Sequence, residues 1–195
     1  GSPLGELSGW TLSIWFEANS DKKGDLLGIV RNENKGEAYR LTYENGSISF
    51  GDPKQKNRPW KLTVQGVEKE KWNHLVISYA QATGPAIYLN AEKMAQGGRG
   101  QMGYATKFDH YHFGAAVHGK GKYGDYFDGK IDDFELHNRP FDEEEVQKLN
   151  QGTSFEGSLV AFNDFENVNH RELAYFNSAK PDDDYLEAGR KLYIQ

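Results

Sequence analysis

Two loops of this sequence place an aromatic ring beside charged or amide side chains. In residues 57–60 an arginine and a proline precede Trp60, and in residues 118–126 two tyrosines flank Asp125 among several glycines. An aromatic ring can cover the C–H face of a pyranose, while amide, carboxylate and guanidinium groups bind its hydroxyls. An arginine and an asparagine at the end of a predicted strand are placed to join either loop. The candidate ligand-binding residues are therefore Arg31, Asn32, Arg58, Trp60, His118, Tyr123, Asp125 and Tyr126.

Each loop also has a structural interpretation that the sequence leaves open. For any single residue the structural interpretation is favoured: Trp60 would be the first core residue of a strand, and the tyrosine loop would pack over the edge of a sheet. His74 lies inside a strand pattern, which favours a core histidine over a ligand. His110 and His112 share one face of a short strand, so a two-histidine metal site competes there with ordinary hydrogen-bonded imidazoles.

No catalytic motif stands out in the sequence. It contains no cysteine, no Gly-x-Ser-x-Gly turn and no His-Glu-x-x-His helix. We therefore expect a protein that binds its ligand without altering it covalently.

Charge and length limit the class of partner. The 195 residues carry 23 Lys and Arg against 29 Asp and Glu, a net charge of −6 with no basic run, which argues against nucleic acid or an anionic membrane as a partner. No apolar run is long enough for a bilayer-spanning helix. Gly1-Ser2 resembles the remnant of a protease site, which predicts a module cut from a longer chain. We expect one domain over residues 1–195.

The hydrophobic pattern is that of short strands separated by turns. Residues 10–16 alternate apolar and polar side chains, and Asn45-Gly46 between two strand-like runs predicts a two-residue hairpin. The expected fold is all-β, a two-sheet antiparallel jelly-roll sandwich with one short helix. The predicted strands cover residues 10–16, 26–31, 38–43, 47–50, 60–64, 71–79, 84–89, 131–136 and 158–165.

Residues 127–149 predict a strand, a sharp corner and a short helix. Strict alternation would turn Ile131, Asp133 and Glu135 to one face and the residues between them to the other. Pro140 breaks the strand, and Asp142 can N-cap a helix whose apolar edge contains a valine and a leucine three residues apart.

This stretch resembles a laminin-G-like or pentraxin-like domain of the concanavalin A-like lectin/glucanase superfamily. The resemblance rests on the phrase Phe127-x-Gly129-x-Ile131-Asp132-Asp133-Phe134, continued by Leu136-His137-Asn138-Arg139, and on the strand pair marked by Trp72, His74, Val76 and Tyr79, then Ile87, Tyr88, Leu89 and Asn90.

The resemblance implies a structural calcium ion near the rim of the sandwich. Its expected ligands are Asp128, Asp133 and Glu166, since calcium prefers carboxylate and carbonyl oxygens. The alternative is that these carboxylates cap turns or face water. Where pentraxins carry a second calcium cluster this chain has Ala115-Ala116-Val117, which disfavours calcium-dependent pentraxin-type binding.

The function that the resemblance implies is a non-catalytic carbohydrate-binding or adhesion module. We expect it to be a monomeric part of a larger secreted or cell-surface protein, binding a glycan or glycoprotein. One alternative is a protein-interaction or architectural module. Another is a glycan hydrolase or lyase, for which Asp132-Asp133-x-Glu135 is the nearest approach to a catalytic phrase.

The order of the motifs predicts either a circularly permuted domain or a segment that straddles the boundary of such a domain. The chain begins almost at the second strand expected of such domains, and the phrase that often opens them stands near the end, at 158–166. Residues 191–195 are therefore predicted to form a strand beside that of residues 10–16.

Overall fold

Thirteen strands, one α-helix and one 3-10 helix make up the described part of the chain. The computed structural model describes residues 9–32, 36–52, 60–99, 110–118 and 122–165. Its elements are β1 (Gly9–Ala18), β2 (Gly24–Asn32), β3 (Gly36–Glu44), β4 (Ser47–Asp52), β5 (Trp60–Gln65), β6 (Trp72–Ala80), β7 (Gly84–Leu89), β8 (Glu92–Gln96), β9 (His110–Phe113), β10 (Ala116–Val117), β11 (Tyr123–Gly124), β12 (Gly129–His137), α1 (Glu143–Asn150), η1 (Glu156–Ser158) and β13 (Leu159–Asn163).

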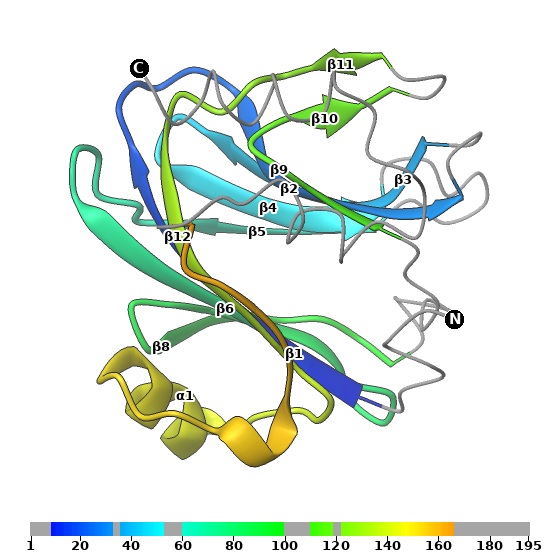
Figure 1. Ribbon diagram of the computed structural model, residues 1–195, viewed down its shortest axis with the longest axis vertical. Helices are drawn as coiled ribbons and strands as arrows, with labels where there is room; N and C mark the ends of the chain where they lie inside the picture. The colour runs from blue at the N-terminus through cyan, green and yellow to red at the C-terminus, as the bar shows by residue number, and fades with distance from the viewer. Residues whose placement is uncertain (1–8, 33–35, 53–59, 100–109, 119–121, 166–195) are drawn as a thin grey trace.

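The strands form two antiparallel sheets that face each other (Figure 1). The six-stranded sheet has the order β13-β12-β1-β6-β7-β8, and the five-stranded sheet has the order β5-β4-β3-β2-β9. The hairpin β10-β11 lies on the outer side of the five-stranded sheet, and α1 lies on the outer side of the six-stranded sheet. The predicted two-sheet antiparallel sandwich with one short helix is confirmed.

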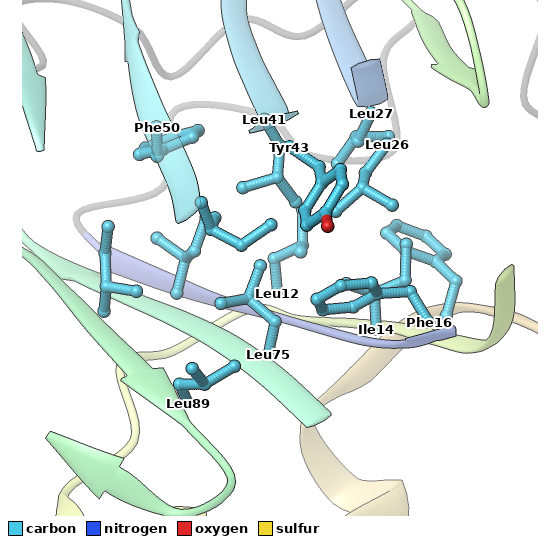
Figure 2. Packing of buried hydrophobic residues seen from close by; sticks show 14 of the residues in the cluster. Leu12, Ile14, Phe16, Leu26, Leu27, Leu41, Tyr43, Phe50, Leu75 and Leu89 are labelled. Atoms are coloured by element: carbon cyan, nitrogen blue, oxygen red, sulfur yellow. The ribbon is translucent and has the colours of Figure 1, made fainter. Parts of the chain in front are cut away.

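The core lies between the inner faces of the two sheets. In Figure 2, Leu12, Ile14 and Phe16 of β1 point from the six-stranded sheet toward side chains of β2, β3 and β4. Each of these three side chains has no exposed surface, so each contributes about 1.5–3 kcal/mol by burial. The alternation read from residues 10–16 is thus the alternation that separates core from outer face.

The hairpin predicted at Asn45-Gly46 is present. Glu44 pairs with Ser47, and both turn residues adopt positive φ angles, 48° and 71°. Such angles define the two-residue turn whose twist matches antiparallel strands, and glycine takes them without a Cβ penalty.

Strict alternation in β12 is wrong, because the strand contains a β-bulge. Between Ser13 and Trp15 of β1 the pairing with β12 slips, and Asp133 takes a φ of 44°. The extra residue shifts the faces. Ile131 therefore packs on the same core as Phe134 and Leu136, while Asp132, opposite the outward Trp15, faces away from it.

Helix α1 closes part of the outer face of the six-stranded sheet. Asp142 caps it by accepting from the Glu145 N–H, and the Glu145 side chain accepts from the Asp142 N–H. This capping box satisfies amides that would otherwise lack partners at the helix start. The helix buries Val146 and Leu149 in a second apolar cluster with Val76 and Tyr88.

The predicted strand 191–195 lies outside the described residues. Its assigned place beside β1 is occupied, since β1 pairs with β6 over Gly9–Glu17 and with β12 over Thr11–Ala18. A strand has only two hydrogen-bonding edges. The described C-terminal strand, β13, pairs with β12.

Candidate ligand-binding site

A buried aspartate organises the outer side of the five-stranded sheet. Asp25, the second residue of β2, accepts a hydrogen bond at Oδ1 from the Thr42 hydroxyl at 2.7 Å, and its Oδ2 lies 3.6 Å from Nε of Arg40. Burial raises the pKa of Asp25, and the Thr42 hydrogen bond and the Arg40 charge oppose that rise only in part. The carboxyl group is therefore held among polar partners at a cost in desolvation.

The segment around β11 is fixed over this aspartate by backbone hydrogen bonds. The Asp25 N–H donates to the Asp125 carbonyl at 2.8 Å, and the Phe127 N–H to the Gly114 carbonyl at 2.9 Å. A Cβ at Gly24 would lie 2.4 Å from the Phe127 Cα, so only glycine permits this approach.

The Asp125 carboxylate lies among three basic side chains. Its Oδ2 is 3.6 Å from Nζ of Lys23, from Nη1 of Arg40 and from Nε2 of His118. These distances exceed those of direct hydrogen bonds. The Asp125 carboxylate is partly exposed, at 31%, so it retains capacity to accept from a ligand hydroxyl.

Two tyrosines from the same segment complete the arrangement. Tyr126, whose backbone bridges to Asp25, is 53% exposed. Tyr123 is half-buried and meets the His112 ring edge-on at 5.9 Å. We call the following set the Asp25 cluster: Lys23, Asp25, Arg40, His118, Asp125 and Tyr126.

The cross-strand neighbours of Arg40 are small. Arg40 pairs with Gly28 of β2 on one side and with Gly51 of β4 on the other. The two directly paired positions therefore add no side chain beside the arginine, whose own side chain is 14% exposed. A partly exposed carboxylate among basic groups, with an exposed tyrosine next to it in the chain, can bind a polyhydroxylated ligand without covalent chemistry.

Four of the eight predicted ligand-binding residues come together in this region: His118, Tyr123, Asp125 and Tyr126. Arg31 and Asn32 end β2, six and seven residues beyond Asp25, which places their backbone about 20 Å or more away. Trp60 begins β5 opposite Asp52, and Arg58 lies outside the described residues. Arg31 and Asn32 therefore lie at the other end of β2 from the tyrosine loop, and their part in a ligand site stays a prediction.

Sequence reasoning missed three members of the Asp25 cluster: Lys23, Asp25 and Arg40. Arg40 was visible as a polar position in the alternating run 39–43, which indicates an outward side chain. Its meeting with Asp25 depends on the β2–β3 register, and that register contains three irregularities. The local sequence carries no signal for them.

Two of the carboxylates predicted to bind calcium, Asp128 and Asp133, lie well apart in the structure. Asp128 and Asp133 are five residues apart along an extended segment, so their backbone positions are separated by about 16 Å, too far to share one ion. The Asp128 carbonyl accepts from the Asn19 N–H, and Glu166 lies outside the described residues. Within the described ranges no group of three His, Cys, Asp or Glu side chains could hold a metal ion.

A second polar cluster lies on the outer face of the six-stranded sheet. His74 accepts at Nε2 from the Ser13 hydroxyl at 2.7 Å and donates from Nδ1 to Asn150 Oδ1 at 2.9 Å. Burial lowers the pKa of His74 to about 4, so the ring is neutral and structural, as its position in the strand predicted. We call the following set the His74 cluster: Ser13, His74, Glu135, His137, Asn150 and Ser158.

The residue types of a catalytic triad also occur in the His74 cluster. His137 lies 2.8 Å from Glu135 Oε2 and 3.0 Å from Ser158 Oγ. Ser158 is only 5% exposed and donates to the Phe155 carbonyl, and His137 has no exposed surface. A nucleophile must reach its substrate, so this geometry is suited to holding β12 against η1.

Comparison with known proteins places the fold in a lectin-like group. A family model described as the concanavalin A-like lectin/glucanases superfamily matches residues 2–147. Among curated protein sequences, none matches this chain.

Solved structures resemble the chain at low sequence identity. A candidate carbohydrate-binding protein from Bacteroides ovatus has a TM-score of 0.62 at 14% identity over 83% of this chain and 46% of that one. The CBM40 of the Ruminococcus gnavus IT-sialidase, bound to α2,3-sialyllactose, has 0.60 at 15% over 74% and 83%. The heptameric SAP-like pentraxin of Limulus polyphemus has 0.57 at 12% over 76% and 72%. At these identities the likeness establishes the fold alone, and this chain spans about half the length of the first.

Proposed function

The chain belongs to the concanavalin A-like lectin/glucanase superfamily, and we propose that it is a carbohydrate-binding module that holds a glycan at the Asp25 cluster. The observation that carries this proposal is the partly exposed Asp125 carboxylate among three basic groups, followed in the chain by the exposed Tyr126. Two of the structural neighbours are described as carbohydrate-binding, which supports the class of ligand.

Recognition would divide between apolar and polar contacts. The face of Tyr126 stacks on the C–H side of a pyranose, and Asp125 accepts from a hydroxyl while Arg40 or His118 donates to a ring or acid oxygen. The buried Asp25 holds the arginine from below. The site is thus positioned by the sheet, and the ligand contacts come from the β11 segment.

We further propose that the module is non-catalytic and acts as part of a larger secreted or surface protein. The carboxylates of the phrase Asp132-Asp133-x-Glu135 support the first point, because Glu135 is bonded to His137 and Asp132 to the Asp133 N–H. The 46% coverage of the Bacteroides ovatus protein agrees with the second. No helix in the described ranges is long and apolar enough to cross a membrane.

The test is glycan-array binding followed by titration of the best glycan. Tyr126→Ala should weaken binding about fivefold or more and His118→Ala a few-fold, since loss of one stacking ring is worth about 1 kcal/mol or more. Phe162→Ala is the matched control, because Phe162 is a comparably exposed ring, at 46%, on β13 of the other sheet. Equal losses for Tyr126→Ala and Phe162→Ala, or release of shortened sugars from the glycan, would count against the proposal.

Calcium remains a separate prediction. One of Asp128 and Asp133, with partners outside the described residues, would be the ligand. Calcium binding is measured as the difference between the melting temperature in calcium and that in chelator. If this difference is the same in the wild type, in Asp128→Asn and in Asp133→Asn, neither residue is a calcium ligand.

A further inference from the structure

The outer face of the six-stranded sheet is closed by α1 at one end and open at the other. Along β6 the outward residues are Ser78, bonded to the Phe141 carbonyl, then Val76 under the helix, then His74, bonded to the last residue of α1. The next outward residue is Trp72, which lies beyond the end of the helix and is 43% exposed.

A second tryptophan shares that open end. The β1–β6 pairing is regular, with Trp15 opposite His74 and Glu17 opposite Trp72. Residues directly paired and residues two apart on one strand share a face, so Trp15 and Trp72 are diagonal neighbours, about 7–8 Å apart at the backbone. We call these two residues the tryptophan patch.

The Trp15 ring is held rigidly. It stacks on the His74 ring with centroids 4.6 Å apart and an angle of 15° between planes. Both ring nitrogens of His74 are hydrogen-bonded, one to Ser13 of β1 and the other to Asn150 of α1. A platform fixed in this way loses little conformational entropy when a ligand binds.

Polar groups of both signs surround the patch. Glu17 forms an ion pair with Lys130 of β12 at 2.7 Å, and Asp132 lies opposite Trp15. Lys71, next to Trp72, pairs with Glu68. An apolar protein partner would have to bury these charges, which is costly without matched partners. A sugar keeps its hydroxyls toward such groups while its C–H face covers indole.

We propose that Trp15 and Trp72 form a second glycan-binding site, which takes a neutral oligosaccharide along the open end of the six-stranded sheet. The near balance of flanking charges argues for a neutral ligand over an acidic one. The inference shares only the class of ligand with the proposed function. It assigns that ligand to the opposite sheet and to residues that the Asp25 cluster does not include.

The experiment is NMR titration of the indole N–H signals with cello-, xylo-, manno- and galacto-tetraose. It is done on the wild type and on Tyr126→Ala, which disables the Asp25 cluster without touching this face. Trp15→Phe and Trp72→Phe assign the signals. In both proteins at least one tetraose should shift the indoles of Trp15 and Trp72, and the buried Trp10 should not respond. Trp72→Ala should lower that affinity at least tenfold, while Met94→Ala, an exposed apolar side chain on β8, should not.

The two proposals fail in different ways. If the indole shifts persist unchanged in Tyr126→Ala, the second site holds whether or not the Asp25 cluster binds glycan. If glycan binding depends on Tyr126 and no tetraose moves the Trp72 indole, the second site is wrong and the first survives. A monomer–dimer equilibrium abolished by Trp72→Ala would also overturn the inference, because it would make a second copy of this chain the occupant.

Discussion

The outer faces of the two sheets both carry buried polar side chains, but they satisfy them in different ways. In the His74 cluster the side chains form hydrogen bonds of 2.7 to 3.0 Å, and α1 and η1 exclude water from them. In the Asp25 cluster the ion pairs are all 3.6 Å long and several members are partly exposed. The first arrangement fixes the fold, and the second leaves polar groups able to bind a ligand.

The two regions also respond to pH in opposite directions. Burial depresses the pKa of His74, so acid favours the unfolded chain there. Burial raises the pKa of Asp25, so the folded protein keeps that proton to a higher pH than the unfolded chain does, and this contribution to stability falls as pH rises above 3.8. Titrating the protein therefore separates the two regions.

The largest effect should come from acidifying the His74 cluster. Between pH 6.5 and about 4 the unfolded chain binds a proton at His74 that the folded protein does not. The free energy of unfolding should therefore fall by about 3 kcal/mol over that window. Urea denaturation at several pH values measures it, and His74→Gln should flatten the curve by that amount.

His118→Gln is the matched control for that titration, since His118 is an exposed imidazole, at 43%. It removes an imidazole while leaving His74 in place. If the pH dependence of His74→Gln does not differ from that of the wild type, the buried imidazole does not couple protonation to folding.

Removing Arg40 should destabilise the Asp25 cluster, because it takes away the positive charge beside the buried carboxylate. Arg40→Met leaves the Asp25 carboxylate buried beside an apolar chain, and we expect a loss of about 2 kcal/mol at neutral pH, below the range for fully buried, hydrogen-bonded pairs. The loss should shrink as the pH falls, because burial raises the pKa of Asp25 and a protonated carboxyl group needs no charged partner. Adding Asp25→Asn should restore most of the stability, and failure of that rescue would mean that Arg40 acts through packing.

The contrast between the two regions explains what the sequence could reveal. The sandwich follows from alternation in β1 and β6 and from the Asn45-Gly46 turn, all of which are local signals. The helix cap at Asp142 is local as well. The tyrosine side of the Asp25 cluster was found because its members lie within nine residues, 118–126.

What the sequence could not reveal depends on pairing between distant strands. Asp25 and Arg40 meet only through an irregular β2–β3 register, and the face of Ile131 is set by the bulge at Asp133. The tryptophan patch needs the β1–β6 register and the position at which α1 ends. None of these has a nearby sequence signature, since a single-residue slip would exchange the faces.

A smaller effect on stability should follow from removing the N-cap of α1, the helix that covers the outer face of the six-stranded sheet. Asp142→Ala removes the side chain that accepts from the Glu145 N–H at 2.9 Å, and loss of an N-cap costs about 1 kcal/mol. Thermal denaturation checks this, with Glu144→Ala as a control, because that glutamate also lies in the first turn but pairs only on the exposed surface with Lys148. Binding at the Asp25 cluster should not change, and a parallel loss of glycan affinity would show that the two faces are coupled.

The smallest effect on stability should come from Gly124→Ala, and its comparison with Gly24→Ala should separate stability from binding beside the Asp25 cluster. A Cβ at Gly124 would lie 2.8 Å from Nε2 of His118, the tip of an exposed side chain that can move away. Gly124→Ala should therefore displace His118 from Asp125 and weaken glycan binding a few-fold, with a melting temperature close to that of the wild type. A Cβ at Gly24 would instead meet the backbone of Phe127, so Gly24→Ala should lower the melting temperature markedly. Calorimetric titration and thermal denaturation of the two variants distinguish a ligand contact from a backbone constraint. If both variants lose the same amount in melting temperature, His118 is held as firmly as the β2 backbone and is not free to adjust to a ligand.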